Sequence, residues 1–175
     1  GAYNAEITPS EKGYSKIYQW DQTGNSGLGS WEIMLSAGGS KIQNTLSDRC
    51  GYCVALSDNG LVFAHGAYAA TQSGGASQTG AIYVYQWDQT ADGGAGSWDL
   101  RATIWGETEY DWSSTVSLNS DGTILMIGEW YATNQSQEGK VRIFEWNSST
   151  SQYVLRGTQL PSRGGGASNP PTGPR

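Results

Sequence analysis

The sequence predicts an all-β protein made of antiparallel four-stranded units of the type that forms propeller blades. Three observations predict this fold class. Residues 18–23, Tyr-Gln-Trp-Asp-Gln-Thr, recur letter for letter at residues 85–90, with a looser copy at residues 144–147. Short hairpin patterns lie between these copies. The composition combines 25 Gly, eight Trp and ten Tyr with only 15% charged residues, which is typical of a Gly-punctuated β protein and not of a disordered chain.

The repeated segment belongs to a hairpin with a long loop. In the first copy, a loop rich in Gly, Asn and Ser at residues 21–30 separates two strand patterns, and a polar loop does the same in the second copy. A Gly-Ser-Trp triplet leads into the second strand of both copies, at residues 29–31 and 96–98. The four strands predicted in these hairpins span residues 15–20, 31–36, 82–87 and 97–103.

A second kind of hairpin, with a tight turn, lies between the long-loop hairpins. Residues 54–66 contain an apolar strand, the turn Ser-Asp-Asn-Gly and a second apolar strand. Residues 116–128 repeat this design around Asn-Ser-Asp-Gly. Asn-Gly and Asp-Gly are strong hairpin signals because such turns need positive φ, which Gly adopts without steric cost. Long and tight hairpins therefore alternate, and one of each makes a four-stranded blade.

The strand patterns also predict that the sheets are covered on both faces. Residues 83–87 and 125–127 are apolar at successive positions, as expected for stacked sheets. The chain holds about two and a half such units, whereas propellers close with at least about four. We therefore expect the faces left open to be closed or continued by neighbouring subunits. The predicted organisation is an N-terminal arm at 1–12, a repeat domain at 13–160 and a Gly/Pro-rich extended tail at 161–175.

The repeats resemble the integrin-α-type β-propeller repeats of secreted and cell-surface proteins. The shared pattern is Val-x-Leu, a polar turn ending in Gly, an apolar strand, a polar loop, and a strand ending in an aromatic, one residue and Trp. It matches residues 54–67 with 80–87, and residues 116–128 with 139–146. The resemblance implies a propeller fold. Many members of that family bind calcium through an Asp-dense loop, but the loops at 68–79 and 130–138 carry Ala, Thr, Gln and Ser. Because calcium needs several carboxylate or carbonyl oxygens, we expect no metal and no cofactor.

Two cysteines, Cys50 and Cys53, form the motif Cys-Gly-Tyr-Cys. A redox motif of this spacing needs a thioredoxin-like strand-to-helix context, which the sequence lacks. A zinc site needs two further ligands, and His65 is the one histidine of the chain. A local disulfide in a secreted protein is the favoured interpretation.

Secretion is also indicated by two glycosylation sequons, at Asn134 and Asn147. No apolar run approaches the roughly 18 residues of a membrane helix, so no membrane span is expected. The net charge is −6 and the basic residues are scattered, which argues against a nucleic-acid partner. The sequence therefore predicts an extracellular glycoprotein, either secreted or at the cell surface.

Catalytic patterns are weak in this chain. His65 stands in mid-strand between Ala64 and Gly66, where a buried, hydrogen-bonded structural role is favoured, and no Ser-His-Asp or Cys-His set forms without it. Residues 107–111 place three acids beside aromatic residues. Such a set can hold or cleave a sugar, but a solvated loop explains it more simply. We therefore predict a protein that is not an enzyme.

The aromatic residues divide into two sets. Those in the repeats keep the strand phase and are expected to pack between sheets. The second set falls near strand ends, where rings provide either a subunit contact or a sugar-stacking platform, and subunit contact is favoured. The repeat set is Tyr18, Trp20, Tyr85, Trp87 and Trp146, and the strand-end set is Trp105, Trp112, Trp130 and Tyr131.

Together these patterns predict a non-enzymatic structural repeat module that assembles with copies of itself into an extracellular filament or surface appendage. Unclosed repeats make head-to-tail contacts, which give open polymers where the rotation does not close. The alternative is a carbohydrate-binding, lectin-like propeller module with glycans as partners, and an extracellular enzyme stands behind both.

Overall fold

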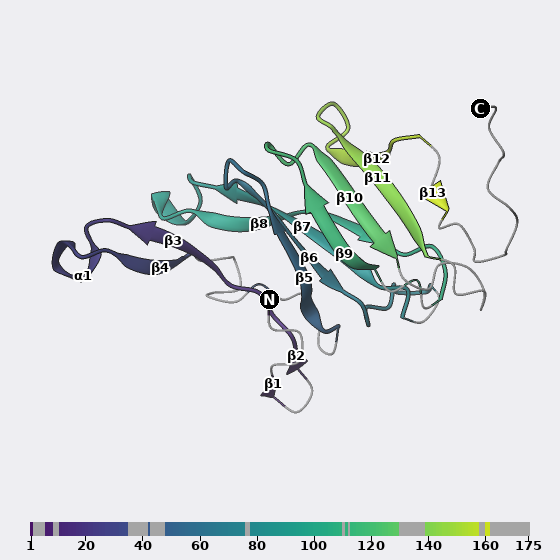
Figure 1. Cartoon of the computed structure of the whole chain (residues 1–175), viewed down its shortest axis with the longest axis horizontal. Helices are drawn as coiled ribbons and strands as arrows, with labels where there is room; N and C mark the ends of the chain where they lie inside the picture. The colour runs from purple at the N-terminus through teal and green to yellow at the C-terminus, as the bar shows by residue number, and fades with distance from the viewer. Residues whose placement is uncertain are drawn as a thin grey trace, which may run out of the picture.

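The protein is all-β, with its strands arranged in antiparallel sheets (Figure 1). The computed structural model describes residues 1, 6–8, 11–34, 42, 48–75, 78–109, 111, 113–129, 139–157 and 160–161. The first strands are β1 (Glu6–Thr8), β2 (Glu11–Lys12), β3 (Ile17–Asp21) and β4 (Ser30–Met34). The next four are β5 (Cys50–Leu56), β6 (Val62–Ala67), β7 (Ala81–Asp88) and β8 (Ser97–Trp105). The last five are β9 (Ser113–Leu118), β10 (Ile124–Glu129), β11 (Lys140–Asn147), β12 (Gln152–Leu155) and β13 (Leu160–Pro161).

Two four-stranded meanders and one hairpin repeat the same design. Strands β5-β6-β7-β8 form one sheet in chain order, and β9-β10-β11-β12 form the next, with β13 also paired to β11. The hairpin β3–β4 carries the first copy of the repeated segment, so it corresponds to β7–β8 and to β11–β12. Each tight turn joins the first two strands of a sheet. A long loop joins β3 to β4 and β7 to β8, whereas a short turn at residues 148–151 joins β11 to β12. The predicted order of the hairpins is confirmed, but a long loop is found in only two of the three hairpins expected to have one. The loop of β11–β12, residues 148–151, is shorter than the tight turns at 57–61 and 119–123, because it lacks the Gly-rich segment of the other two copies.

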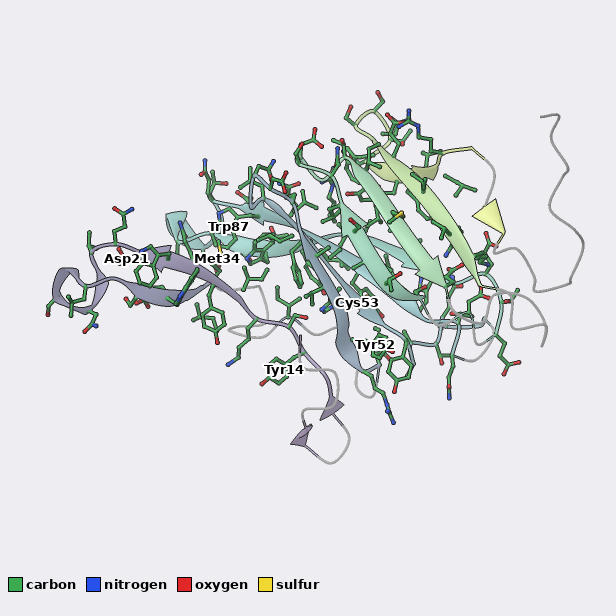
Figure 2. The ribbon with its side chains drawn as sticks, viewed as in Figure 1. Tyr14, Asp21, Met34, Tyr52, Cys53 and Trp87 are labelled. Atoms are coloured by element: carbon green, nitrogen blue, oxygen red, sulfur yellow. The ribbon has the colours of Figure 1, made fainter. Side chains whose placement is uncertain are left out.

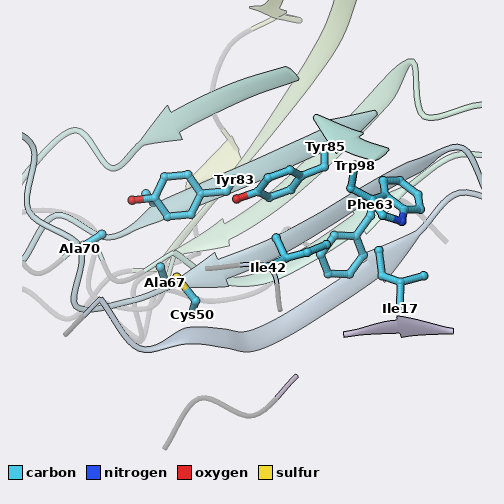
Figure 3. Close-up of a cluster of buried hydrophobic side chains, with 10 residues drawn as sticks. Ile17, Ile42, Cys50, Phe63, Ala67, Ala70, Tyr83, Tyr85 and Trp98 are labelled. Atoms are coloured by element: carbon cyan, nitrogen blue, oxygen red, sulfur yellow. The ribbon is translucent and has the colours of Figure 1, made fainter. Parts of the chain in front are cut away.

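The central strands of the middle sheet, β6 and β7, are buried on both faces over most of their length. Alternate residues of β6 and β7 point to opposite sides and enter two separate apolar clusters. The first cluster faces β3–β4 (Figure 3) and contains Ile17, Ile42, Cys50, Phe63, Ala67, Ala70, Ala81, Tyr83, Tyr85 and Trp98. The second cluster faces the sheet β9–β12 and contains Val62, Ala64, Ile82, Val84, Ile104, Leu125, Ile127 and Phe144. A strand with apolar residues at successive positions is thus explained by neighbours on both sides.

Successive sheets are also held in register by their tight turns. The amide N of Asn59 donates a hydrogen bond of 3.0 Å to the carbonyl O of Ser120, joining the two turns. Gly122 has φ of +71°, and a Cβ at this position would lie 2.4 Å from the Cβ of Val62. Gly is therefore required here both by the turn geometry and by the approach of the neighbouring sheet. The repeated turn sequence serves the stacking of units as well as the hairpin itself.

The described residues form an open stack of sheets, without closure into a ring. The long loops contain short helical turns that the sequence did not indicate, α1 (Gly24–Gly27) and η1 (Asp92–Gly94). The expected N-terminal arm contains the short pair β1–β2, and β13 includes the first residue of the expected tail, Pro161. Residues 162–175 lie outside the described residues.

Candidate functional site

Each repeat carries a pair of aromatic rings across its last two strands. Trp20 packs edge-on against Trp31 with ring centroids 5.3 Å apart. The other two repeats hold equivalent pairs: Trp87 with Trp98 at 5.5 Å, and Trp146 with Tyr153 at 5.1 Å. Edge-to-face and tilted pairs of this kind add stabilisation beyond the area they bury. The repeated tryptophan is therefore half of a cross-strand pair that each unit rebuilds.

The Gly-Ser-Trp triplet exists because a ring covers its glycine. Gly29 and Gly96 have φ of +84° and +83°, and a Cβ at either position would lie 2.1 Å from the ring of Trp20 or Trp87. Each loop begins with an acidic side chain that folds it: Asp88 Oδ1 accepts bonds from both the amide N and the hydroxyl of Thr90 at 2.8 and 2.7 Å. These Asx-type turns lower the pKa of Asp88. The six-residue repeat is thus a strand end followed by its turn.

The ring pairs differ greatly in exposure. Trp98 is 1% exposed, whereas its counterpart Trp31 is 65% exposed. The sheet β5–β8 has β3–β4 in front of its aromatic side, and Met34 of β4 and Trp87 of β7 both pack against the first cluster (Figure 2). We call the side of β3–β4 that bears Tyr18, Trp20 and Trp31 the head face. The head face is an exposed aromatic surface. The equivalent aromatic surface of the next sheet, on β7–β8, is buried.

Arg101 stands three residues after Trp98, as Met34 stands three residues after Trp31, and Arg101 covers the third ring pair. Its guanidinium lies 3.7 Å from the ring centroid of Trp146 and 5.3 Å from that of Tyr153. Its Nη1 donates a hydrogen bond of 3.1 Å to Gln86 Oε1, which holds the guanidinium in place. Arg101 is half-buried, and burial lowers its pKa. A cation–π contact therefore joins the sheet β5–β8 to the sheet β9–β12.

A charged cluster joins the same two sheets at another place. Lys140 Nζ donates hydrogen bonds of 3.0 Å to Glu107 Oε2 and to Asp111 Oδ2, and it lies 3.2 Å from Glu129 Oε2, so three carboxylates surround it. Arg142 pairs with Glu129 and also donates to the carbonyl O of Trp105 at 2.8 Å. Glu107 and Asp111 follow β8, whereas the other three belong to the last sheet. The cluster is a clamp between sheets.

Burial and ion pairing act in opposite directions on the pKa values of this clamp. Burial alone would lower the pKa of Lys140, but its hydrogen bonds to Glu107 and Asp111 and the charge of Glu129 outweigh that effect and raise it. Burial would raise the pKa of Asp111, yet hydrogen bonds from Thr108 and Lys140 lower it. Burial raises the pKa of Glu129, opposed by Arg142 and Lys140. The interpretation of residues 107–111 as a solvated loop is wrong for Asp111, which is fully buried, because a lysine from another sheet draws it inward.

His65 is buried in the first cluster, as the sequence indicated. Its Nδ1 lies 2.9 Å from Ser15 Oγ, and its ring packs edge-on against Phe63, Tyr83 and Tyr85. Burial, together with the charge of the amino terminus, lowers its pKa to about 3. His65 is therefore a neutral member of an aromatic cluster at physiological pH.

The structure does not form the disulfide expected between Cys50 and Cys53, since both are free cysteines. The reason is the alternation of the strand: Cys50 belongs to the first cluster and Cys53 packs against the second, on the opposite face of the sheet. Cys53 fills the space over Gly66, where a Cβ would lie 2.4 Å from its Sγ. Burial raises the pKa of Cys53 to about 11. Both thiols act as small apolar side chains.

The remaining predicted site residues have different outcomes. Trp105 is partly buried against the first cluster, 6.2 Å from the ring of Tyr83, so its ring is a packing element. Asn147 is exposed, but its Oδ1 accepts a bond of 3.0 Å from the amide N of Ser149, as Asp88 does for Thr90. Glycosylation of Asn147 stays a prediction. Trp112, Trp130, Tyr131 and Asn134 lie outside the described residues.

Sequence reasoning did not single out Trp31, Arg101 and Arg156 as contact residues. Trp31 was readable as the partner of Trp20 from the repeated Gly-Ser-Trp triplet. Arg101 and Arg156 share a weaker signal: each stands three residues after the second aromatic of its pair, Trp98 or Tyr153.

Comparison with known proteins assigns no family, since no family model and no curated protein matches the chain. Among the described residues, no three His, Cys, Asp or Glu side chains converge as metal ligands. No helix in that part of the chain is long and apolar enough to cross a membrane.

Proposed function

We propose that this protein is a non-enzymatic structural repeat module that assembles with copies of itself. The observation that carries the proposal is the unequal burial of one repeated motif: Trp98 is 1% exposed, and its counterpart Trp31 is 65% exposed. Tyr85 and Tyr18, another equivalent pair, are 5% and 46% exposed. A surface built to be covered in one repeat stands open in another, and exposed aromatic surfaces of this kind mark interaction sites.

The other end of the stack supports the same proposal. We call the outward side of the sheet β9–β12, which bears Met126, Ile143, Val154 and Arg156, the tail face. Met126 is 45% and Val154 is 49% exposed. The residues equivalent to Met126 and Ile143 in the middle sheet, Ala64 and Val84, are fully buried by the next unit. Repeat proteins obtain much of their stability from such contacts between units, so both open ends favour association.

The proposed location is extracellular, with a filament or surface appendage as the assembled form. The sequons at Asn134 and Asn147 and the low charge support this location. The free cysteines remove the disulfide from that argument. Propeller-type closure, in which the units of several chains complete one ring, is the second form that the repeat design allows.

Sedimentation of the purified chain over a range of concentrations tests the proposal. We expect the weight-average mass to rise with concentration through the micromolar range, and negative-stain microscopy of the associated material to distinguish rings from fibres. A compact monomer at all concentrations contradicts the proposal.

A carbohydrate-binding module is the second candidate, and the exposure of Trp31 favours it, because an indole face can stack on a sugar ring. The two rings of the head-face pair are inclined by 66°, so together they do not form a flat platform. A glycan array with Trp31→Ala as the matched control tests this candidate. Binding that disappears in the variant supports it.

A further inference from the structure

The contact between the middle and last sheets shows how one unit of this protein holds the next. Arg101 projects from β8 and stacks on the Trp146–Tyr153 pair, with its guanidinium 3.7 Å from the Trp146 centroid. Gln86, the residue before the repeated Trp87, holds the guanidinium at 3.1 Å. This contact, which we call the arginine–ring device, has two halves. One half is an arginine held by a polar side chain on one face, and the other is a pair of crossed rings on the face of the following unit.

The tail face carries the first half of this device. Arg156 stands three residues after Tyr153, as Arg101 stands three residues after Trp98. Its Nε lies 3.6 Å from Glu145 Oε2, and Glu145 precedes Trp146 as Gln86 precedes Trp87. The side chain of Arg156 is 62% exposed. Among the described residues, no aromatic ring covers its guanidinium. A supported arginine therefore stands at the open end without its ring pair.

The head face carries the second half. Trp20 and Trp31 form the same crossed pair as Trp146 and Tyr153, with centroids 5.3 Å apart and planes inclined by 66°. The inclination of the Trp146–Tyr153 pair is 64°, so the two pairs offer the same geometry. Trp20 is 45% exposed. The ring pair at the head is complete and lacks a cation over it among the described residues.

The surroundings of the two halves also match. Around Arg156, the tail face presents Val154 and Ile143, and a surface hollow of about 440 Å³ lies beside Glu145, Val154 and Arg156. Around the ring pair, the head face presents Tyr18, which is 46% exposed. The equivalent ring Tyr85 packs into the apolar first cluster. Apolar surface therefore surrounds the polar device on both sides, as at the centre of protein interfaces.

We propose that the head face of one copy of this chain docks on the tail face of another, with Arg156 stacked on Trp20 and Trp31. The proposal deepens the self-assembly proposed above and rests on it. The two faces are different surfaces, so the contact is heterologous and leaves one head and one tail open after each addition. This contact between two chains repeats the contact that joins β5–β8 to β9–β12 within one chain. Successive sheets along the polymer are therefore spaced as they are within the chain.

Two variants test this arrangement, and in each of them one of the two faces has lost its contact residues. The head variant is Trp20→Ala/Trp31→Ala and the tail variant is Val154→Asp/Arg156→Glu. All four side chains are exposed, and circular dichroism checks that both variants keep the β signal. We expect each variant alone to associate at least about thirtyfold more weakly than the natural chain, because central aromatic and arginine residues dominate interfaces. A 1:1 mixture is expected to form a dimer that does not grow. The intact tail face of the head variant binds the intact head face of the tail variant, and the two faces that remain open are both altered.

Matched controls separate the stacking from charge and from general surface effects. Arg156→Lys keeps the charge but loses the planar stack, and is expected to weaken association about five- to tenfold. Leu28→Ala, at the exposed tip of the same hairpin, is expected to leave association unchanged.

The outcomes distinguish this inference from the proposed function. If the natural chain associates but either variant alone associates equally well, self-assembly stands and the head-to-tail contact is overturned. If the mixture of variants stays monomeric, the contact is likewise overturned. A natural chain that never associates overturns both proposals.

Discussion

The hairpins β3–β4 and β7–β8 present one sequence motif in two different surroundings. Both contain the repeated six residues, the covered glycine and the crossed ring pair. In β7–β8 the second ring, Trp98, is 1% exposed, and in β3–β4 the second ring, Trp31, is 65% exposed. The local structure is set by the motif, because the turn and the covered glycine depend on residues of the same hairpin. Burial is set by whether another sheet stands in front.

This comparison gives the same tryptophan two different energetic roles. A ring buried by a neighbouring unit contributes to the stability of the folded chain. The same ring left exposed contributes little until a partner covers it. The first kind of substitution therefore acts on unfolding, and the second kind acts on association.

The largest expected effect comes from removing the buried member of the equivalent pair. Trp98→Ala should lower the free energy of unfolding by about 3–5 kcal/mol, because it opens a cavity in the first cluster. Trp31→Ala should change it by less than about 1 kcal/mol at concentrations where the chain is monomeric. Chemical denaturation followed by circular dichroism measures both. Equal losses in the two variants break the comparison.

The two inter-sheet contacts differ in chemistry as well as in extent. Where the middle sheet places Ala81 and Tyr83 toward its neighbour, the last sheet places Lys140 and Arg142. Lys140→Met should cost about 3–5 kcal/mol, because it leaves the buried carboxylate of Asp111 without its cation and Glu129 with Arg142 alone.

The exposed ion pair at the tail is the control for that prediction. Arg156→Met removes a cation whose partner, Glu145, is 54% exposed, and the expected loss is within about 1 kcal/mol. Denaturation of the two variants under one set of conditions provides the measurement. A stability of Lys140→Met equal to that of the natural chain contradicts the clamp.

Much of the fold was predictable because the repeated segments contain clear turn and strand patterns. The Asn-Gly and Asp-Gly turns fix the tight hairpins, and the successive apolar residues of β7 require covered faces. The clamp was not predictable, since the acids at 107–111 meet Lys140 only after two sheets stack. The prediction of a disulfide was wrong for a related reason. The short spacing of the two cysteines suggests a bond, whereas the strand places Cys50 and Cys53 on opposite faces of the sheet.

His65 gives the first cluster a pH dependence that the second cluster does not share, because the equivalent residue of the last sheet is Ile127. The pKa of His65 is lowered to about 3 in the folded chain, while the unfolded chain binds a proton below about pH 6.5. Stability should therefore fall as the pH falls from about 6.5 toward 3, by about 1.4 kcal/mol per pH unit.

His65→Ile, which copies the last sheet, should remove this slope. Asp48 and Glu129, whose pKa values burial raises, act in the opposite sense, and Asp111, with its lowered pKa, acts only at lower pH. These groups are present in both chains and cancel in the difference. Denaturation midpoints at several pH values give that difference. Parallel pH profiles for the two chains refute the assignment to His65.

The smallest expected effect concerns the residue that one unit places over the ring pair of the next. Arg101 has this position, and its sequence counterpart in the first hairpin is Met34, which packs against the first cluster. Arg101→Met introduces the side chain of that counterpart and should cost about 1 kcal/mol, because methionine packs on the rings but lacks the cation. Arg101→Ala should cost more, since it also loses the packing of the long side chain. Denaturation of both variants separates the two contributions. If methionine and alanine are equally costly, the contact depends on the cation alone, and the expected contribution of side-chain packing is absent.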